Sequence, residues 1–288
     1  MLLTPRYDGP EVLRLEVPAG DLWALVVRQR RRMLDAVAGL DASQWARQSR
    51  CEGWSLRDVL AHLVQTNHVW HLSVSAALAG EPTRMMAGFD PVVGPDQQVA
   101  TTRGLPTPQV LQEYGQTTEA LAELVADLPG QGSVIGESPL GHVTLDEVAL
   151  HALWDAWTHE RDMLLPLGVA PAEEPDEVLA CLYYVAAIGP ALLATWGSAR
   201  RGTLVVEVTE PDTRFVVEAG PSVTIRPSGG APVSSNGSSN GNTARLTGSA
   251  LALVEGLTMR APLPPGTPGD HWMLTGLPTA FDVLPRSA

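Results

Sequence analysis

The sequence predicts an N-terminal four-helix bundle over residues 1–170 and a smaller α+β domain over residues 171–288. Four stretches before residue 166 repeat apolar residues at helical spacing, and capping or helix-breaking residues bound them. After residue 170 the pattern changes to short strand-like runs with turn residues between them. Long helices joined by loops favour an antiparallel bundle, which gives the first half its predicted architecture.

Composition narrows the class of protein. The chain of 288 residues carries a net charge of −13, and all 19 basic residues are Arg. This charge argues against a nucleic-acid or anionic-membrane partner, because phosphate binding needs a basic face. The absence of Lys excludes lysine-based chemistry such as a Schiff base. No long apolar run is present and the N-terminal residues turn polar quickly, so we expect a cytoplasmic protein without a membrane span.

The first two helices are predicted over residues 21–40 and 55–79, each from apolar residues that recur at helical spacing. Arginines between positions 28 and 32 interrupt the first helix, and we expect them to be solvated. Ser55 is placed to cap the second helix. His62 lies near the edge of the apolar face of that helix, where a packed, hydrogen-bonded histidine is the ordinary finding.

A loop rich in Gly, Pro and Met is predicted over residues 80–106. The third helix follows over residues 107–128, with a proline in its first turn. A glycine-rich connection then leads to the fourth helix, over residues 144–163. Thr144 and Glu147 have the spacing of a capping box and fix the start of this helix.

The second half of the chain reads as one helix followed by strands. The helix, over about residues 175–196, is very apolar. Strand-like runs follow at TLVVEV, RFVVEA and SVTIRP, and the low-complexity segment SGGAPVSSNGSSNGN separates them from a final strand and short helix. A short alternating piece near the N-terminus, VLRLEV, is predicted to be an edge strand.

Several side chains are expected only to pack. Cys51 and Cys181 are too few for a disulfide framework, and we expect both thiols to be buried and inert. Trp54, Trp154 and Trp157 flank the polar positions of the second and fourth helices without sharing their face, which favours packing roles for them as well.

His151, Asp155 and His159 occur at successive four-residue steps along the fourth helix. Residues four apart lie on the same helix face, so the three side chains point the same way. The stripe runs along the edge of the apolar arc, where it can face a shared cavity. The pattern is compatible with two ligands for a metal from Asp155 and His159, and equally with a solvated face that contains two histidines.

Two stretches together resemble a known family. GWSLRDVLAHL is similar to the second-helix signature of the mycothiol-dependent maleylpyruvate isomerase family, and WDAWTHERD is similar to its fourth-helix signature. The family belongs to the DinB-like metal-binding four-helix bundles. Its members commonly carry a second, sterol-carrier-like α+β domain. The resemblance therefore implies a DinB-like bundle followed by a sterol-carrier-like domain.

The resemblance also implies a metal site. In the family one His of the second helix and an acid–x–x–x–His pair of the fourth helix hold the metal, and these positions fall on His62, Asp155 and His159. The isomerases usually carry Glu where this chain has Asp155, so the metal is expected to lie nearer the fourth helix. Two imidazoles and a carboxylate suit zinc, although nickel, iron or manganese also bind such sets. His151 is a reserve ligand.

Mycothiol, held by the metal as its thiolate, is the thiol cosubstrate that the resemblance implies. The implied activity is that of an isomerase or thiol transferase acting on a small electrophilic metabolite. Arg260 falls where family members place a basic residue near the cleft, which makes it the candidate catalytic and cofactor-binding residue. Two alternatives stay open: a thiol-independent metalloenzyme of a secondary pathway, and a non-catalytic protein that encloses an apolar ligand. The expected partners are a small-molecule substrate and a low-molecular-weight thiol, with no nucleic acid or membrane.

Overall fold

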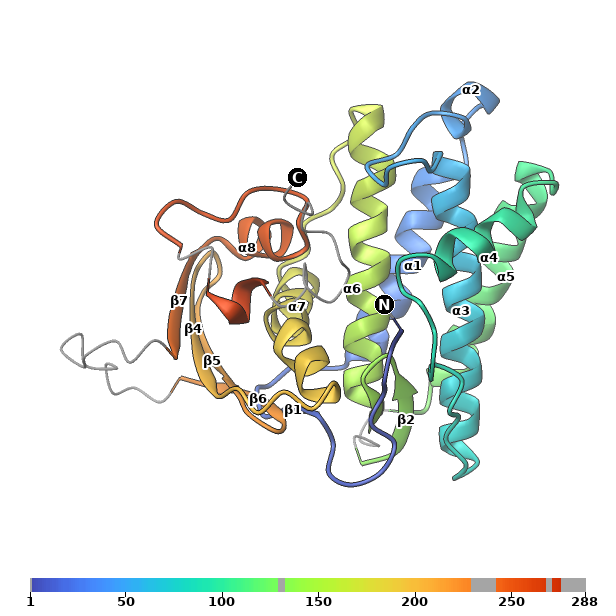
Figure 1. Cartoon of the computed structure of the whole chain (residues 1–288). Coiled ribbons are helices and arrows are strands. Elements are labelled where there is room, and N and C mark those ends of the chain that lie inside the picture. The colour runs from blue at the N-terminus through green and yellow to red at the C-terminus, as the bar shows by residue number, and fades with distance from the viewer. Residues whose placement is uncertain (1, 129–132, 229–241, 268–270, 276–288) are drawn as a thin grey trace, which may run out of the picture.

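The computed structural model describes residues 2–128, 133–228, 242–267 and 271–275, and confirms the predicted combination of helices and sheet (Figure 1). The helices are α1 (Leu22–Val37), α2 (Ala42–Trp45), α3 (Leu56–Leu78), α4 (Gly94–Thr102), α5 (Thr107–Val125), α6 (Leu145–Leu164), the 3₁₀ turn η1 (Leu165–Leu167), α7 (Pro175–Thr195) and α8 (Ala250–Leu257). The strands are β1 (Leu13–Leu15), β2 (Ile135–Ser138), β3 (Gly141–Thr144), β4 (Gly202–Thr209), β5 (Asp212–Ala219), β6 (Val223–Pro227) and β7 (Thr243–Gly248).

The four long helices α1, α3, α5 and α6 form the bundle at the positions that the sequence predicts. Capping boxes begin the two helices that matter most for the site. Ser55 and Asp58 exchange hydrogen bonds at the start of α3, and Thr144 and Glu147 do so at the start of α6. Each box satisfies backbone N–H groups that the first helical turn leaves unpaired, so the phase of both helices is fixed locally.

Two elements differ from the sequence prediction. The predicted loop 80–106 contains α4, which buries Val99 and offers little apolar periodicity besides. The predicted glycine-rich connection before α6 contains the antiparallel hairpin β2–β3. Gly141 in this hairpin has a φ of +109°, and a Cβ there would lie 2.0 Å from the carbonyl oxygen of Arg6. Glycine is thus required for close backbone approach, not for a flexible linker.

The sheet of the second half takes in a strand from the first. Its order is β1-β6-β5-β4-β7, with β1 parallel to β6 at one edge and β7 parallel to β4 at the other. The N-terminal edge strand is therefore confirmed. Figure 1 shows α7 lying between this sheet and α6, and α7 contacts both of them.

Helix α7 is a core element. It is long and apolar enough to cross a membrane by length and composition, but 83% of the window that meets this test is buried inside the protein. One hydrophobic cluster joins α7 to residues of both halves, among them Trp70 and Leu150 from the bundle and Val206 from the sheet. The division into domains at residue 170 stays a prediction. The low-complexity stretch 229–241 and the chain after residue 275 lie outside the described residues.

The arginines of α1 are not simply solvated, contrary to the sequence prediction. Arg30 is 1% exposed and donates to Asn67 on α3 and to the carbonyl oxygen of Ala152 on α6. Arg32 bridges Glu160 on α6 and Glu177 on α7, two carboxylates whose side chains are 2% and 0% exposed. These contacts tie α1 to the three helices around it.

We expect Arg32→Ala to lower the free energy of unfolding by about 3–5 kcal/mol, because it leaves the buried carboxylate of Glu160 without a cation. Arg31→Ala is the matched control, since the Arg31 pair with Glu119 is exposed on both sides. The control should cost less than about 1 kcal/mol. Urea unfolding of the two variants measures the difference. Equal losses of unfolding free energy would show that the buried ion pairs of Arg32 stabilise the fold no more than the exposed pair of Arg31.

Candidate metal centre and its cavity

Three predicted ligands come together where α3 faces α6. His62 Nε2 lies 3.6 Å from Asp155 Oδ1, and His159 Nε2 lies 3.5 Å from the same oxygen. One ligand atom from each residue lies within 4.8 Å of the other two. The four-residue spacing on α6 aligns Asp155 with His159, and the packing of α3 against α6 brings His62 to them.

The chemistry of this set fits a divalent cation. Asp155 Oδ2 and His62 Nδ1 are buried and have no hydrogen-bond partner among the described residues. Burial alone raises the pKa of Asp155, but the hydrogen bond with His62 and the charges of His62 and His159 outweigh it, and the net pKa is lowered. An ionised carboxylate beside two imidazoles, with buried atoms left unpaired, is an arrangement that a bound metal would complete.

A second layer holds His159 in place. Its Nδ1 lies 3.1 Å from Oδ2 of Asp162, which is fully buried. Arg260 donates to Asp162 through Nε at 2.9 Å and Nη2 at 2.8 Å. A carboxylate on the outer nitrogen of a ligand histidine fixes its tautomer and leaves Nε2 free to bind. The left-handed backbone of Met259, with a φ of 61°, directly precedes Arg260.

A cavity of about 710 Å³ opens beside the three ligands. Its walls come mainly from α3, α6, α7, α4 with the segment before it, the segment before α3 and the residues after α8. Arg260 and Cys51 lie on this wall near His159, whereas His151 lies two turns earlier on α6. Apolar and aromatic side chains supply much of the remaining wall: Leu3, Trp54, Val69, Trp70, Met85, Met86, Phe89, Trp154, Ile188, Leu192 and Met259.

Cys51 was expected to be buried and inert, and the burial is wrong. Its thiol is only half-buried, lines the cavity, and donates to Asp162 Oδ2 at 3.1 Å. With His159 and Asp162 it forms a second group of three potential metal ligands. Cys181 agrees with the expectation, because it is buried in α7 and burial raises the pKa of its thiol well above the usual range.

The tryptophans divide between core and cavity. Trp157 is 1% exposed and stacks with the Arg161 guanidinium, as a packing residue would. Trp54 and Trp154 pack against the core and also line the cavity. The Trp54 ring lies 5.3 Å from the His62 ring, and its Nε1 donates to Asp96. Trp54 and Trp154 therefore face the cavity in addition to packing against the core.

His151 does not join the ligand set. It belongs to neither group of potential ligands found among the described residues. Its Nδ1 hydrogen-bonds the hydroxyl of Tyr184 on α7 instead.

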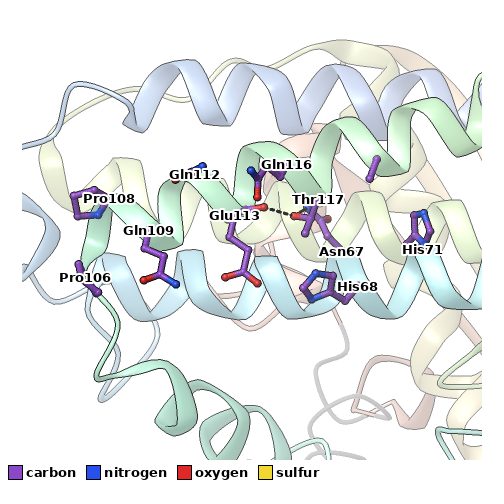
Figure 2. Close-up of a pocket in the computed structure, with 11 residues that line it drawn as sticks. Asn67, His68, His71, Pro106, Pro108, Gln109, Gln112, Glu113, Gln116 and Thr117 are labelled. Carbon is purple, nitrogen blue, oxygen red and sulfur yellow. Dashed lines mark hydrogen bonds between the residues drawn. The ribbon is translucent and has the colours of Figure 1, made fainter.

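A second hollow lies on the outside of the bundle, between α3 and α5 (Figure 2). Its volume is about 950 Å³, and polar side chains such as His68, Gln109 and Glu113 line it. Neither of the potential metal-ligand groups found in the described part of the chain lies there. Both groups include residues that line the cavity beside α6.

Residues 26–164 match the family model described as the mycothiol maleylpyruvate isomerase N-terminal domain. This segment of the chain belongs to that domain family. All three ligand candidates lie inside the matched segment, whereas Arg260 lies beyond it. Two crystal structures share the fold over most of the chain: a mycothiol-dependent maleylpyruvate isomerase and its histidine-to-alanine mutant. Each is 16% identical, with a TM-score of 0.57 over 85% of this chain and 90% of the other. No curated protein gives a significant match.

The pH dependence of stability tests whether burial keeps the imidazole of His151 neutral in the folded protein. Burial lowers the pKa of His151 to about 4. Between that value and the unfolded pKa of about 6.5 the unfolded chain binds more protons, so stability is lost as the pH falls. Between about pH 7 and pH 4 the free energy of unfolding of the metal-free wild type should fall by about 3 kcal/mol more than that of the metal-free His151→Phe variant. Urea unfolding across this range gives the comparison, and parallel curves would refute the expectation.

Proposed function

We propose that this protein is a metal-dependent, mycothiol-dependent isomerase or thiol transferase that acts on a small electrophilic metabolite. The convergence of His62, Asp155 and His159 on one point of a large cavity carries the proposal. The family of the bundle supports the thiol, and three protein ligands leave metal positions open for it. Zinc is the metal that two imidazoles and one carboxylate favour.

A bound divalent metal would keep a coordinated thiol deprotonated at neutral pH. The chain's own residues provide the setting for that chemistry. His62, Asp155 and His159 would hold the metal, and Asp162 keeps the Nδ1 side of His159 engaged. The largely apolar wall would exclude water from the reacting groups. The small-molecule substrate would occupy the cavity beside this centre.

Arg260 has a defined place in this proposal. Its guanidinium lines the cavity, and two of its N–H groups donate to Asp162. Its first role is therefore to position His159 through that carboxylate. Its side chain remains 26% exposed, and an acidic group of the thiol cosubstrate is a suitable partner for the remaining donors. Arg260 is thus proposed as a positioning residue and as a contact for the cofactor.

Substitution of the ligands tests the metal site. His62→Ala and His159→Ala should lose the metal and any mycothiol-dependent activity together, because three protein ligands are a minimal set. His151→Ala should keep the metal, since His151 stands outside the set. Elemental analysis of the purified variants measures their metal content. Titration with mycothiol then measures whether each variant still binds the thiol. A stoichiometric metal in His62→Ala together with its loss from His151→Ala would refute this ligand assignment.

Removing the arginine tests the second layer. Arg260→Met should weaken metal affinity about 10- to 100-fold, because Asp162 loses two donors and no longer holds His159 firmly. Arg57→Met serves as control, since Arg57 donates to the carbonyl oxygens of Thr102 and Leu105 away from the ligands. Competition with a chelator of known affinity gives the ratio. Equal affinities in both variants would remove Arg260 from the site.

A further inference from the structure

His151 lines the cavity and hydrogen-bonds a tyrosine hydroxyl, and this contact indicates where its ring proton lies. The Tyr184 hydroxyl is buried, and its hydrogen-bond partner in the described part of the chain is Nδ1 of His151. A hydroxyl with this one neighbour satisfies its proton by donating to Nδ1. His151 then carries its own proton on Nε2.

This Nε2–H group is available to a ligand. His151 lines the cavity, and no hydrogen bond joins its Nε2 to any described residue. Nε2 has no partner, yet it is not one of the fully buried unpaired atoms of the described chain. It is therefore exposed to the cavity. The imidazole is neutral at neutral pH because burial lowers its pKa to about 4. The group is therefore an uncharged donor.

The surroundings of His151 are aromatic and apolar. The ring of Trp70 lies 5.0 Å from the His151 ring and that of Trp154 lies 5.6 Å from it. The Nε1 atoms of both indoles are buried and have no acceptor among the described residues. Ile188 and Leu192 of α7 add aliphatic surface to the same cavity. A flat, largely apolar ligand that brings an oxygen acceptor would match this end.

The two ends of the cavity differ in charge. Arg260 is the arginine that lines the cavity in the described part of the chain, and it binds Asp162. Asp162 is eleven residues beyond His151 on α6, which corresponds to about 16 Å along a helix. An anionic group is best placed near Arg260. The neutral donor of His151 suits an uncharged acceptor, because a carboxylate buried without a cation is costly.

We propose that His151, oriented by Tyr184, forms a subsite that binds an uncharged carbonyl oxygen of a flat, largely apolar ligand. Asp155 follows His151 by one turn, so the carbonyl would lie about 6 Å along α6 from the ligand set. This subsite deepens the proposed function, and it rests on that function only in taking this cavity as the substrate site. The expected substrate class is an aldehyde or ketone in which the carbonyl is attached to a planar apolar group.

Binding of two isosteric probes to the full-length protein tests the subsite. Acetophenone and α-methylstyrene have nearly the same shape, but the first has a carbonyl where the second has a methylene group. One added neutral hydrogen bond should make acetophenone bind about 2- to 13-fold more tightly. In His151→Phe this preference should fall to about 1-fold, with α-methylstyrene still bound. NMR titration of the indole N–H signals gives the affinities.

His71→Phe is the matched control, because His71 lies on α3 at the outer groove and hydrogen-bonds Ser75. It should keep the wild-type preference. A measurement that needs no variant is the nitrogen-15 spectrum of the His151 ring, which should show the proton on Nε2. Tyr184→Phe, which removes the orienting hydroxyl, should reduce the acetophenone preference.

Equal binding of the two probes by the wild type would overturn the subsite, and so would an unchanged preference in His151→Phe. A proton on Nδ1, or benzoate bound more tightly than acetophenone in a manner that needs His151, would overturn it as well. The metal content of each variant is measured in parallel. A wild-type protein that binds metal at His62, Asp155 and His159 but shows no probe preference refutes the subsite alone. A protein that binds no metal at His62, Asp155 and His159 but keeps the preference refutes only the proposed function.

Discussion

The buried carboxylate of Asp162 is the group on which the arrangement of the site depends. It is fully buried, and its neighbours are His159 from its own helix, Cys51 before α3 and Arg260 after α8. An isolated carboxylate at this position would be strongly unfavourable, so the fold stabilises it only when all three segments are in place. The same contacts orient the histidine, shape one wall of the cavity, and join the bundle to the second half of the chain.

Much of this architecture could be predicted because it is encoded locally. The capping box at Thr144 and the i, i+4 spacing of Asp155 and His159 need no knowledge of distant residues, and both are present in the structure. His62 is different. Its place near the edge of an apolar helix face fits a core histidine equally well, and only the family signature singled it out. The meeting of the three ligand candidates depends on how α3 packs against α6.

The errors concern residues whose partners are distant in sequence. The arginines of α1 look solvated by themselves, but Arg32 meets Glu160 and Glu177 more than 120 residues away. One signal was present, since Glu177 opens a helix that is otherwise very apolar and an acid there needs a buried cation. Cys51 gave no such signal. Its position on the cavity wall results from the turn before α3, which has no periodic pattern to interpret.

The pairing of β1 with β6 has a consequence for the order in which the molecule can form. Leu13 lies beside Val223, so β1 has no partner in the sheet until more than 200 further residues have been made. Contacts between such distant segments form slowly, because a long loop has to close first. Arg260 is made later still, because it follows β6 and α8 in the chain. During synthesis the bundle would therefore carry the three ligand candidates before Arg260 reaches Asp162, and the arrangement of the site would be among the later events of folding.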